Sequence, residues 1–298
     1  MFSDKKDKGK IIKGIAGFYY VQSEEKSLFA CKAKGLFRNM GIKPLVGDDC
    51  VIRITDEEKK EGNVEEILPR KNEIIRPACA NIDEAVVVVS ASKPVIKYTL
   101  LDKILVFFGF YDIPVCICLN KTDEVEEKLF TEFLGRYSGS GAKLIFTSSL
   151  TGDGLGELEN HIRHKTVILT GPSGTGKSSL INVMFPEACM ETGEVSRIGR
   201  GRHTTRHTEI FSIDKDTFVA DTPGFTSLSL PEIDPERLKY FFREFEPYEG
   251  RCRFDMCTHL HEPDCTVRNA VETGMIPEGR YSSYKEFFEE LKNRKKKM

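Results

Sequence analysis

A phosphate-binding loop is the clearest chemical motif in this chain of 298 residues. Residues 168–182 read ILTGPSGTGKSSLIN, and Gly171 to Ser178 match the pattern G-x4-G-K-S/T. Glycines let backbone N–H groups turn toward phosphate oxygens, and we expect Lys177 to reach the outer phosphates and the Ser178 hydroxyl to bind Mg²⁺. The predicted nucleotide contacts in this loop are Gly171, Pro172, Ser173, Gly174, Thr175, Gly176, Lys177, Ser178 and Ser179.

The sequence FVADTPG at residues 218–224 supplies a second part of such a site. Asp221 stands at the end of an expected strand, where its carboxylate can hold Mg²⁺ through water. The backbone of Gly224 can approach the outermost phosphate, because glycine has no side chain to block it. These two motifs together suit either ATP or GTP.

The sequence NKTD at residues 120–123 favours guanine over adenine. The carboxylate of Asp123 can accept hydrogen bonds from both N1–H and the exocyclic amine of guanine, whereas adenine offers neither donor on that edge. We expect the base to be contacted from two loops, whose residues are Asn120, Lys121, Thr122, Asp123, Ser148 and Ser149. An enzyme that uses ATP is the alternative, and NKTD argues against it.

The residue that orients the attacking water is less evident. Many nucleotide hydrolases of this type place a glutamine after the glycine of D-x-x-G, but here that position is Phe225. The two candidates are His203 and His207. We predict that His203 takes this role, because it adjoins the threonines expected near the γ-phosphate and a neutral imidazole can position or polarise water. Its neighbour Thr204 or Thr205 is expected to bind Mg²⁺. The alternative is that His203 contacts RNA phosphate or solvent.

A cysteine and histidine cluster near the C-terminus predicts a metal site. Cys252, Cys257, His259 and Cys265 supply three thiolates and one imidazole, which is a usual closed set for structural Zn²⁺. His261 is an alternative ligand. The alternative to a metal site is that these cysteines are reduced and unrelated to one another.

The nucleotide motifs are expected to lie on an α/β core. Four apolar segments predict buried parallel strands, and helical patterns lie between them. The strands are expected at 84–92, 113–120, 142–149 and 166–171, and the helices near 97–110, 124–138 and 153–164. This alternation is typical of a doubly wound sheet.

The N-terminal residues predict a small β-barrel. Short strand patterns separated by glycine-containing turns occur at 13–21, 27–35, 46–54 and 62–70. Their number and size favour an OB-fold, which often binds single-stranded or irregular nucleic acid. A barrel that only packs on its neighbour is the alternative. We therefore expect three domains: 1–70 as an RNA-binding OB-fold, 71–230 as the nucleotide domain, and 231–298 as a mainly helical zinc-binding domain.

The order of the nucleotide motifs indicates a circular permutation. The base loops near 120 and 148 precede the phosphate loop at 171 and the Mg²⁺ loop at 221. The same site can form in this order if the old chain ends are close together. One consequence is that the segment after DTPG leads directly into the C-terminal domain, so nucleotide state could move that domain as a lever.

Charge and composition point to a polyanionic partner. The net charge is only -2, but residues 1–43 hold ten Lys/Arg against four Asp/Glu, and the chain ends in KNRKKKM. Solvated basic tails are the alternative. No signal peptide or membrane-spanning segment is predicted, so we expect a cytoplasmic monomer that does not bind membranes.

The motifs together resemble the circularly permuted ribosome small-subunit-dependent GTPase A family over nearly the whole chain. The matching sequences are NKTD, TSS, GPSGTGKSS, GRGRHTT, DTPGF and CRFDMCTHLHEPDC. The resemblance implies an N-terminal OB domain, a permuted GTPase domain and a zinc-bearing C-terminal domain. It also points to His203 in catalysis, with Mg²⁺ as cofactor for GTP.

The resemblance further implies a GTPase that hydrolyses GTP to GDP and phosphate. Such an enzyme would be stimulated by the small ribosomal subunit and its rRNA, act late in the maturation of that subunit, and leave it on hydrolysis. The rival from another functional class is a GTP-binding scaffold that hydrolyses nothing of consequence, and Phe225 keeps that rival open. A glycine-rich turn without a ligand is the remaining alternative for the phosphate loop.

Overall fold

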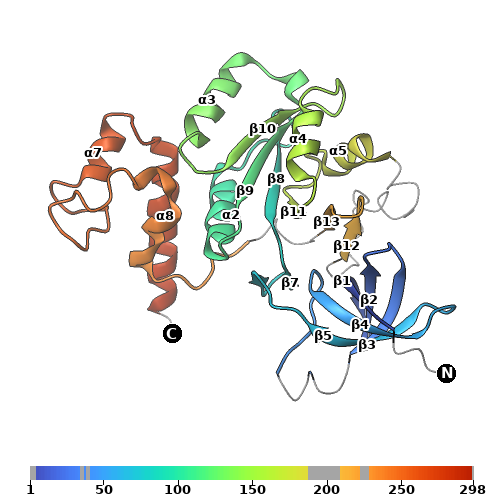
Figure 1. The fold of residues 1–298 in the computed structure, drawn as a ribbon. Helices are drawn as coiled ribbons and strands as arrows, with labels where there is room; N and C mark the ends of the chain where they lie inside the picture. The colour runs from blue at the N-terminus through green and yellow to red at the C-terminus, as the bar shows by residue number, and fades with distance from the viewer. Residues whose placement is uncertain (1–4, 34–36, 38–40, 187–208, 222–227, 297–298) are drawn as a thin grey trace.

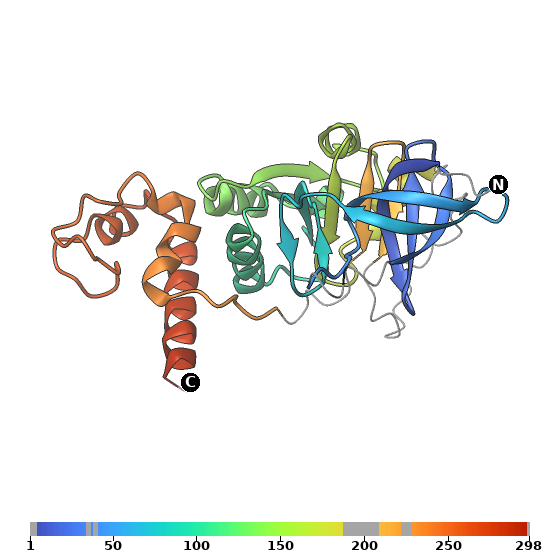
Figure 2. The same ribbon diagram turned by 60° about the horizontal axis from the view of Figure 1, so that its bottom comes forward.

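Three parts of the chain lie in a row (Figures 1 and 2). The computed structural model describes residues 5–33, 37, 41–186, 209–221 and 228–296. A β-barrel stands at one end, an α/β layer lies in the middle, and a C-terminal helical part stands at the other end. The expected fold class is confirmed.

The barrel contains five strands in the order β1-β2-β3-β5-β4, and β1 also pairs with β4 to close it. Strands β3 and β5 are parallel and the other pairs are antiparallel, which is the connectivity of an OB-fold. Alternate side chains such as Ile11, Val21 and Ile52 fill its interior. The strands are β1 (Lys6–Ile15), β2 (Phe18–Ser23), β3 (Leu28–Ala33), β4 (Asp49–Asp56) and β5 (Glu61–Ile67).

One strand expectation in the barrel is wrong. Residues 13–21, expected as a single strand, contain the end of β1, a turn and the start of β2. Ala16 and Gly17 form the turn with φ values of 51° and 86°, the left-handed conformation that tight hairpins require. The apolar and aromatic residues on both sides hide this turn, because alanine is an uncommon residue at such a position.

The central layer is a six-stranded sheet with the order β10-β9-β8-β11-β13-β12. All neighbours are parallel except β12 and β13. The strands are β8 (Glu84–Ser90), β9 (Val115–Asn120), β10 (Lys143–Thr147), β11 (Thr166–Thr170), β12 (Glu209–Ser212) and β13 (Phe218–Asp221). The base-loop strands β9 and β10 therefore precede the phosphate-loop strand β11 in the chain, as the permutation predicts.

Helices cover both faces of this sheet, as Figure 1 shows. Side chains of α2 (Tyr98–Phe110) and α3 (Glu127–Tyr137) pack with Val87 on one face. Side chains of α4 (Leu155–Ile162) and α5 (Lys177–Met184) pack with Val86 on the other. The alternation of neighbouring valines between two cores explains why the strand is apolar throughout.

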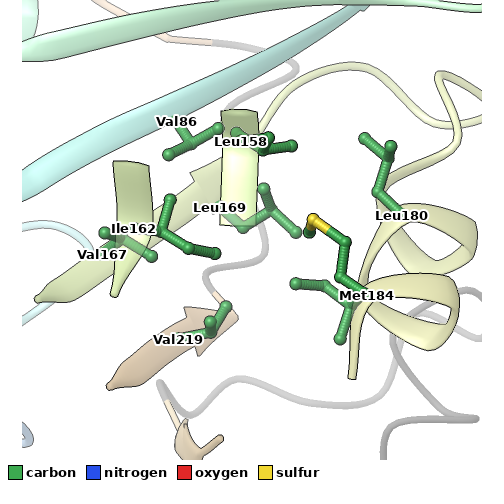
Figure 3. Close-up of a pocket in the computed structure, with 9 residues that line it drawn as sticks. Val86, Leu158, Ile162, Val167, Leu169, Leu180, Met184 and Val219 are labelled. Atoms are coloured by element: carbon green, nitrogen blue, oxygen red, sulfur yellow. The ribbon is translucent and has the colours of Figure 1, made fainter. Parts of the chain in front are cut away.

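A small apolar cavity lies between the sheet and the helices α4 and α5 (Figure 3). Its volume is about 10 Å³. The residues around it are Val86, Leu158, Ile162, Val167, Leu169, Leu180, Ile181, Met184 and Val219. Because these side chains offer no polar partner, the cavity is a packing gap and not a ligand site.

The C-terminal part is mainly helical and is built around aromatic rings. Phe242, Phe245, Tyr284 and Phe287 form its core together with two cysteines. Its elements are the 3₁₀ helices η4 (Pro235–Phe241) and η5 (Arg243–Phe245) and the α-helices α7 (Thr266–Glu272) and α8 (Glu278–Lys295). Among the described residues, none of the helices combines the length and apolar character that crossing a bilayer demands.

Short elements and side-chain contacts join the three parts. The strands β6 (Glu73–Ile74) and β7 (Cys79–Ala80) form a separate two-stranded sheet between the barrel and the central layer. β1 pairs with β12, and the amide of Gln22 donates to the hydroxyl of Ser212 at 2.9 Å. On the opposite side, α8 packs against α2 through a buried ion-pair network centred on Asp102.

Candidate nucleotide and metal sites

The phosphate loop connects the C-terminal end of β11 to the N-terminus of α5, in the middle of the sheet. Gly171, Gly174 and Gly176 all have positive φ, between 83° and 133°. A Cβ atom on Gly171 would lie 2.1 Å from the carbonyl oxygen of Val88, so only glycine allows this approach to β8. The motif therefore occupies the strand-to-helix turn at which anions commonly bind.

The side chains of this loop fold back on its own backbone. The ammonium of Lys177 donates to the carbonyl oxygens of Gly171 and Pro172, at 2.7 Å each. The hydroxyl of Thr175 donates to Pro172 at 3.0 Å. Lys177 is thus held over the concave side of the loop, where it can bind phosphate oxygens.

Asn120 joins three loops at one point. This side chain is fully buried at the end of β9, and its Nδ2 donates to the carbonyl oxygen of Thr175 at 2.9 Å. Its Oδ1 accepts from the hydroxyl of Thr147 at 3.1 Å and from the backbone N–H of Ser149 at 3.3 Å. The phosphate loop, the NKTD loop and the loop after β10 therefore form one continuous site, although Asn120 and Thr175 are 55 residues apart.

The carboxylate of Asp123 is oriented by the next loop. It accepts a hydrogen bond from the hydroxyl of Ser148, and that hydroxyl accepts from the backbone N–H of Thr151 at 3.1 Å. Thr122 donates to the carbonyl oxygen of Thr147 at 3.1 Å. These contacts bring together five of the six residues that the sequence assigns to the base, all but Lys121.

A turn that the sequence analysis missed borders the same site. The carbonyl oxygen of Lys93, in residues 90–94, accepts from the ammonium of Lys121 at 2.7 Å. Its position in the sequence could have indicated this role. The turn follows β8, which neighbours the phosphate-loop strand β11. Ligands of such sheets bind at the carboxyl ends of the strands.

The predicted Mg²⁺ and catalytic residues are only partly placed. The backbone of Asp221 ends β13 and is paired with Leu169 at the edge of the phosphate loop. Ser178 lies in the first turn of α5. The residues His203, Thr204, Thr205, Gly224 and Phe225, and the side chain of Asp221, lie outside what the structure describes.

The predicted zinc ligands come together in the C-terminal part. The ligand atoms of Cys252, Cys257, His259 and Cys265 all lie within 4.8 Å of one another. The Sγ atoms of Cys252 and Cys265 are 3.9 Å apart, and the Nδ1 atom of His259 is 3.6 Å and 3.4 Å from them. Tetrahedral Zn²⁺ with bonds of about 2.0–2.3 Å needs ligand separations of roughly 3.5–4 Å. His261 is exposed and is not part of the cluster.

Neighbouring groups fix the orientation of the histidine. The carboxylate of Glu249 lies 2.7 Å from the Nε2 atom of His259, which leaves Nδ1 toward the cysteines. Burial lowers the pKa of His259, which favours the neutral imidazole that binds metals. Tyr281 donates to the carbonyl oxygen of His259 at 2.7 Å and so ties α8 to this loop. The cluster fits Zn²⁺ held by four protein ligands.

The zinc site gives a prediction that separates the two histidines. His259→Ala is expected to weaken Zn²⁺ binding by more than about 100-fold, because loss of a ligand costs more than loss of its hydrogen-bond partner. His261→Ala is the matched control and should keep one tightly bound Zn²⁺. Competition with a chromogenic chelator measures both affinities, and equal losses in the two variants would contradict the assignment.

Comparisons with known proteins agree with this geometry. Residues 67–231 match the RsgA GTPase family and residues 8–64 match the RsgA N-terminal domain. The chain is 48% identical to the small ribosomal subunit biogenesis GTPase RsgA of Agathobacter rectalis, with 97% of this chain and 99% of that protein covered. It is 44% identical to the RsgA of Alkaliphilus metalliredigens, with the same coverage of 97% and 99%.

Two crystal structures resemble the whole chain. YjeQ from Thermotoga maritima superimposes with a TM-score of 0.83 at 33% identity, covering 96% of this chain and 99% of that one. YloQ, a circularly permuted GTPase, superimposes with a TM-score of 0.80 at 36% identity, covering 97% and 96%. Because the similarity extends from end to end, this chain belongs to the RsgA family of circularly permuted GTPases.

Proposed function

We propose that this protein hydrolyses GTP to GDP and phosphate in the late maturation of the small ribosomal subunit. The observation that carries the proposal is the contact of Asn120 with the phosphate loop, because it joins base recognition and phosphate binding in one site. Family membership and the relatives from A. rectalis and A. metalliredigens support the same function.

The proposed nucleotide contacts follow from the site. Asp123, oriented by Ser148, accepts from N1–H and the amine of guanine, and the backbone N–H groups of Gly171 and of residues 173–176 bind the phosphates together with Lys177. Mg²⁺, which offsets phosphate charge when bound, would be held by Ser178, Asp221 and one of the threonines at 204 and 205. His203 would orient the water that attacks the terminal phosphate.

We propose that the chain has three domains, residues 1–70, 71–230 and 231–298. The first and the third would contact rRNA. On the barrel, Phe18 is exposed and the ammonium of Lys32 lies 5.3 Å from its ring centre. In the C-terminal part, Phe254 is exposed beside Arg253, whose guanidinium lies 5.7 Å from the ring centre. An aromatic face with an adjacent positive charge suits unpaired RNA bases.

GTP turnover with and without purified small ribosomal subunits tests this function, with large subunits and ATP as controls. We expect small subunits to raise the rate of GTP hydrolysis, and we expect no such increase with large subunits or with ATP as substrate. Turnover that no subunit raises, with GTP binding intact, would favour the non-catalytic scaffold. A binding competition between GTP and ATP tests the alternative of an ATP-using enzyme: if ATP does not displace GTP, that alternative is excluded.

The catalytic assignment has its own test. His203→Ala is expected to lower subunit-stimulated kcat by about 100-fold or more, with little change in GTP affinity, because a water-orienting imidazole acts in the transition state. His207→Ala is the matched control in the same segment. Unchanged turnover of His203→Ala on the subunit would remove His203 from the mechanism.

A further inference from the structure

The turn after β8, residues 90–94, contacts both halves of the nucleotide site although it belongs to neither motif. Ser90 ends β8 and is almost fully buried, with 1% of its surface exposed. Its hydroxyl donates to the carbonyl oxygen of Lys93 at 2.9 Å and accepts from the backbone N–H of Ser92 at 3.3 Å. The Ser90 hydroxyl therefore restrains the Lys93 carbonyl from inside the turn.

That carbonyl is the acceptor for the lysine of the NKTD loop. The ammonium of Lys121 donates to it at 2.7 Å, and a second link joins the backbone N–H of Ala91 to the carbonyl oxygen of Asn120 at 2.8 Å. Lys121 has a φ of 65°, a left-handed conformation that non-glycine residues adopt only when their surroundings hold them there. The turn supplies such a restraint.

The other side of the turn faces the phosphate loop. A Cβ atom built on Gly174 would lie 3.6 Å from the Cδ atom of Pro94, so the proline ring lies beside this loop. The turn thus spans from the base loop to the phosphate loop.

We propose that Ser90 is a positioning residue for guanine nucleotides. By holding the Lys93 carbonyl toward Lys121, it keeps the base loop in its binding conformation before the nucleotide arrives, and this lowers the ordering cost of binding. The inference rests on the proposed guanine site and identifies a residue outside the motifs that sets its affinity.

Ser90→Ala is expected to weaken the binding of GDP and GTP by about 5- to 10-fold, the effect of one lost hydrogen bond. KM for GTP should rise by a similar factor while kcat changes much less, because the restraint acts equally on ground and transition states. Ser92→Ala is the matched control, since the Ser92 hydroxyl has no hydrogen-bond partner among the described residues. Ser90→Thr, which keeps the hydroxyl, should bind like the wild type.

A double-mutant cycle with Lys121→Ala gives the decisive readout. If Ser90 acts through the Lys93 carbonyl, its substitution should cost nothing further once the ammonium of Lys121 is absent. Fluorescence titration with a labelled GDP measures affinity in the full-length protein, and the melting temperature reports on folding.

Three results would overturn the assignment: unchanged affinity in Ser90→Ala, an undiminished loss in the Lys121→Ala background, or an equal loss in Ser92→Ala. Failure of the proposed guanine site is distinguishable, because then the wild type would not discriminate GTP from ATP and Asp123→Asn would have no effect.

Discussion

Replacing Asp123 with asparagine is expected to lower GTP affinity by roughly 10³-fold and to create affinity for xanthosine triphosphate. The asparagine amide presents an N–H₂ group where guanine also carries an amine, so two donors face each other. Xanthine has a carbonyl at that position, and it can accept from the amide while its N1–H donates to the amide oxygen. Competition titrations with GTP, xanthosine triphosphate and ATP would measure the change.

The neighbouring residue supplies a matched control for this prediction. Glu124 is exposed in the same short 3₁₀ helix, η1 (Thr122–Glu124). Glu124→Gln removes an equal charge from the loop, so it should keep the preference for GTP. A similar loss in both variants would mean that the net charge of the loop, and not the Asp123 carboxylate, selects the base.

Replacing Arg280 with methionine is expected to lower the free energy of local unfolding of the C-terminal part by about 3–5 kcal/mol. Arg280 is completely buried; its Nε donates to Glu244 at 2.6 Å and its Nη1 to Asp102 at 2.7 Å. Burial alone would lower the pKa of Arg280, but these two carboxylates raise it above its ordinary value. Methionine fills similar volume and leaves Glu244 buried without the guanidinium that serves both of its oxygens.

Hydrogen exchange of α8 measures this effect where it occurs. The expected loss corresponds to roughly 10²- to 5 × 10³-fold faster exchange of the protected α8 amides. The double variant Arg280→Met with Glu244→Leu should recover much of the protection, because an apolar pair can replace a buried ion pair. The control is Lys295→Ala. Lys295 is also on α8, but its ion pair with Asp234 is exposed, so its removal should change the exchange rates little. Full protection in Arg280→Met would show that the network contributes no stability.

The same network refines the idea of a nucleotide-driven lever. Asp102 on α2 accepts from Arg280 and Ser283 of α8 and from Arg136 and Tyr137 of α3. A swing of the C-terminal part away from α2 would expose these buried charges. We therefore expect any movement of the C-terminal part to take α2 and α3 with it, and α2 begins directly after the 90–97 segment that borders the nucleotide site.

The groups whose chemistry depends on residue type and local spacing could be identified from the amino-acid sequence alone. The glycines of the phosphate loop, the NKTD loop and the cysteine ligands could be located because a turn conformation or a hydrogen-bond donor set needs those residue types near one another in the chain. The apolar strands and intervening helices likewise predicted a doubly wound sheet, since burial on both faces requires apolar residues at successive positions. The permuted order of the motifs was also readable from the chain.

The folded structure was needed to establish contacts between distant residues of ordinary type. It selected His259 over His261, showed that residues 13–21 turn back as a hairpin, and joined Ser90 and Lys93 to Lys121. It also brought together Asp102 and Arg280, which are 178 residues apart. A lone serine, aspartate or arginine has no local signature of burial, because its desolvation is compensated only by partners that packing supplies from elsewhere in the chain.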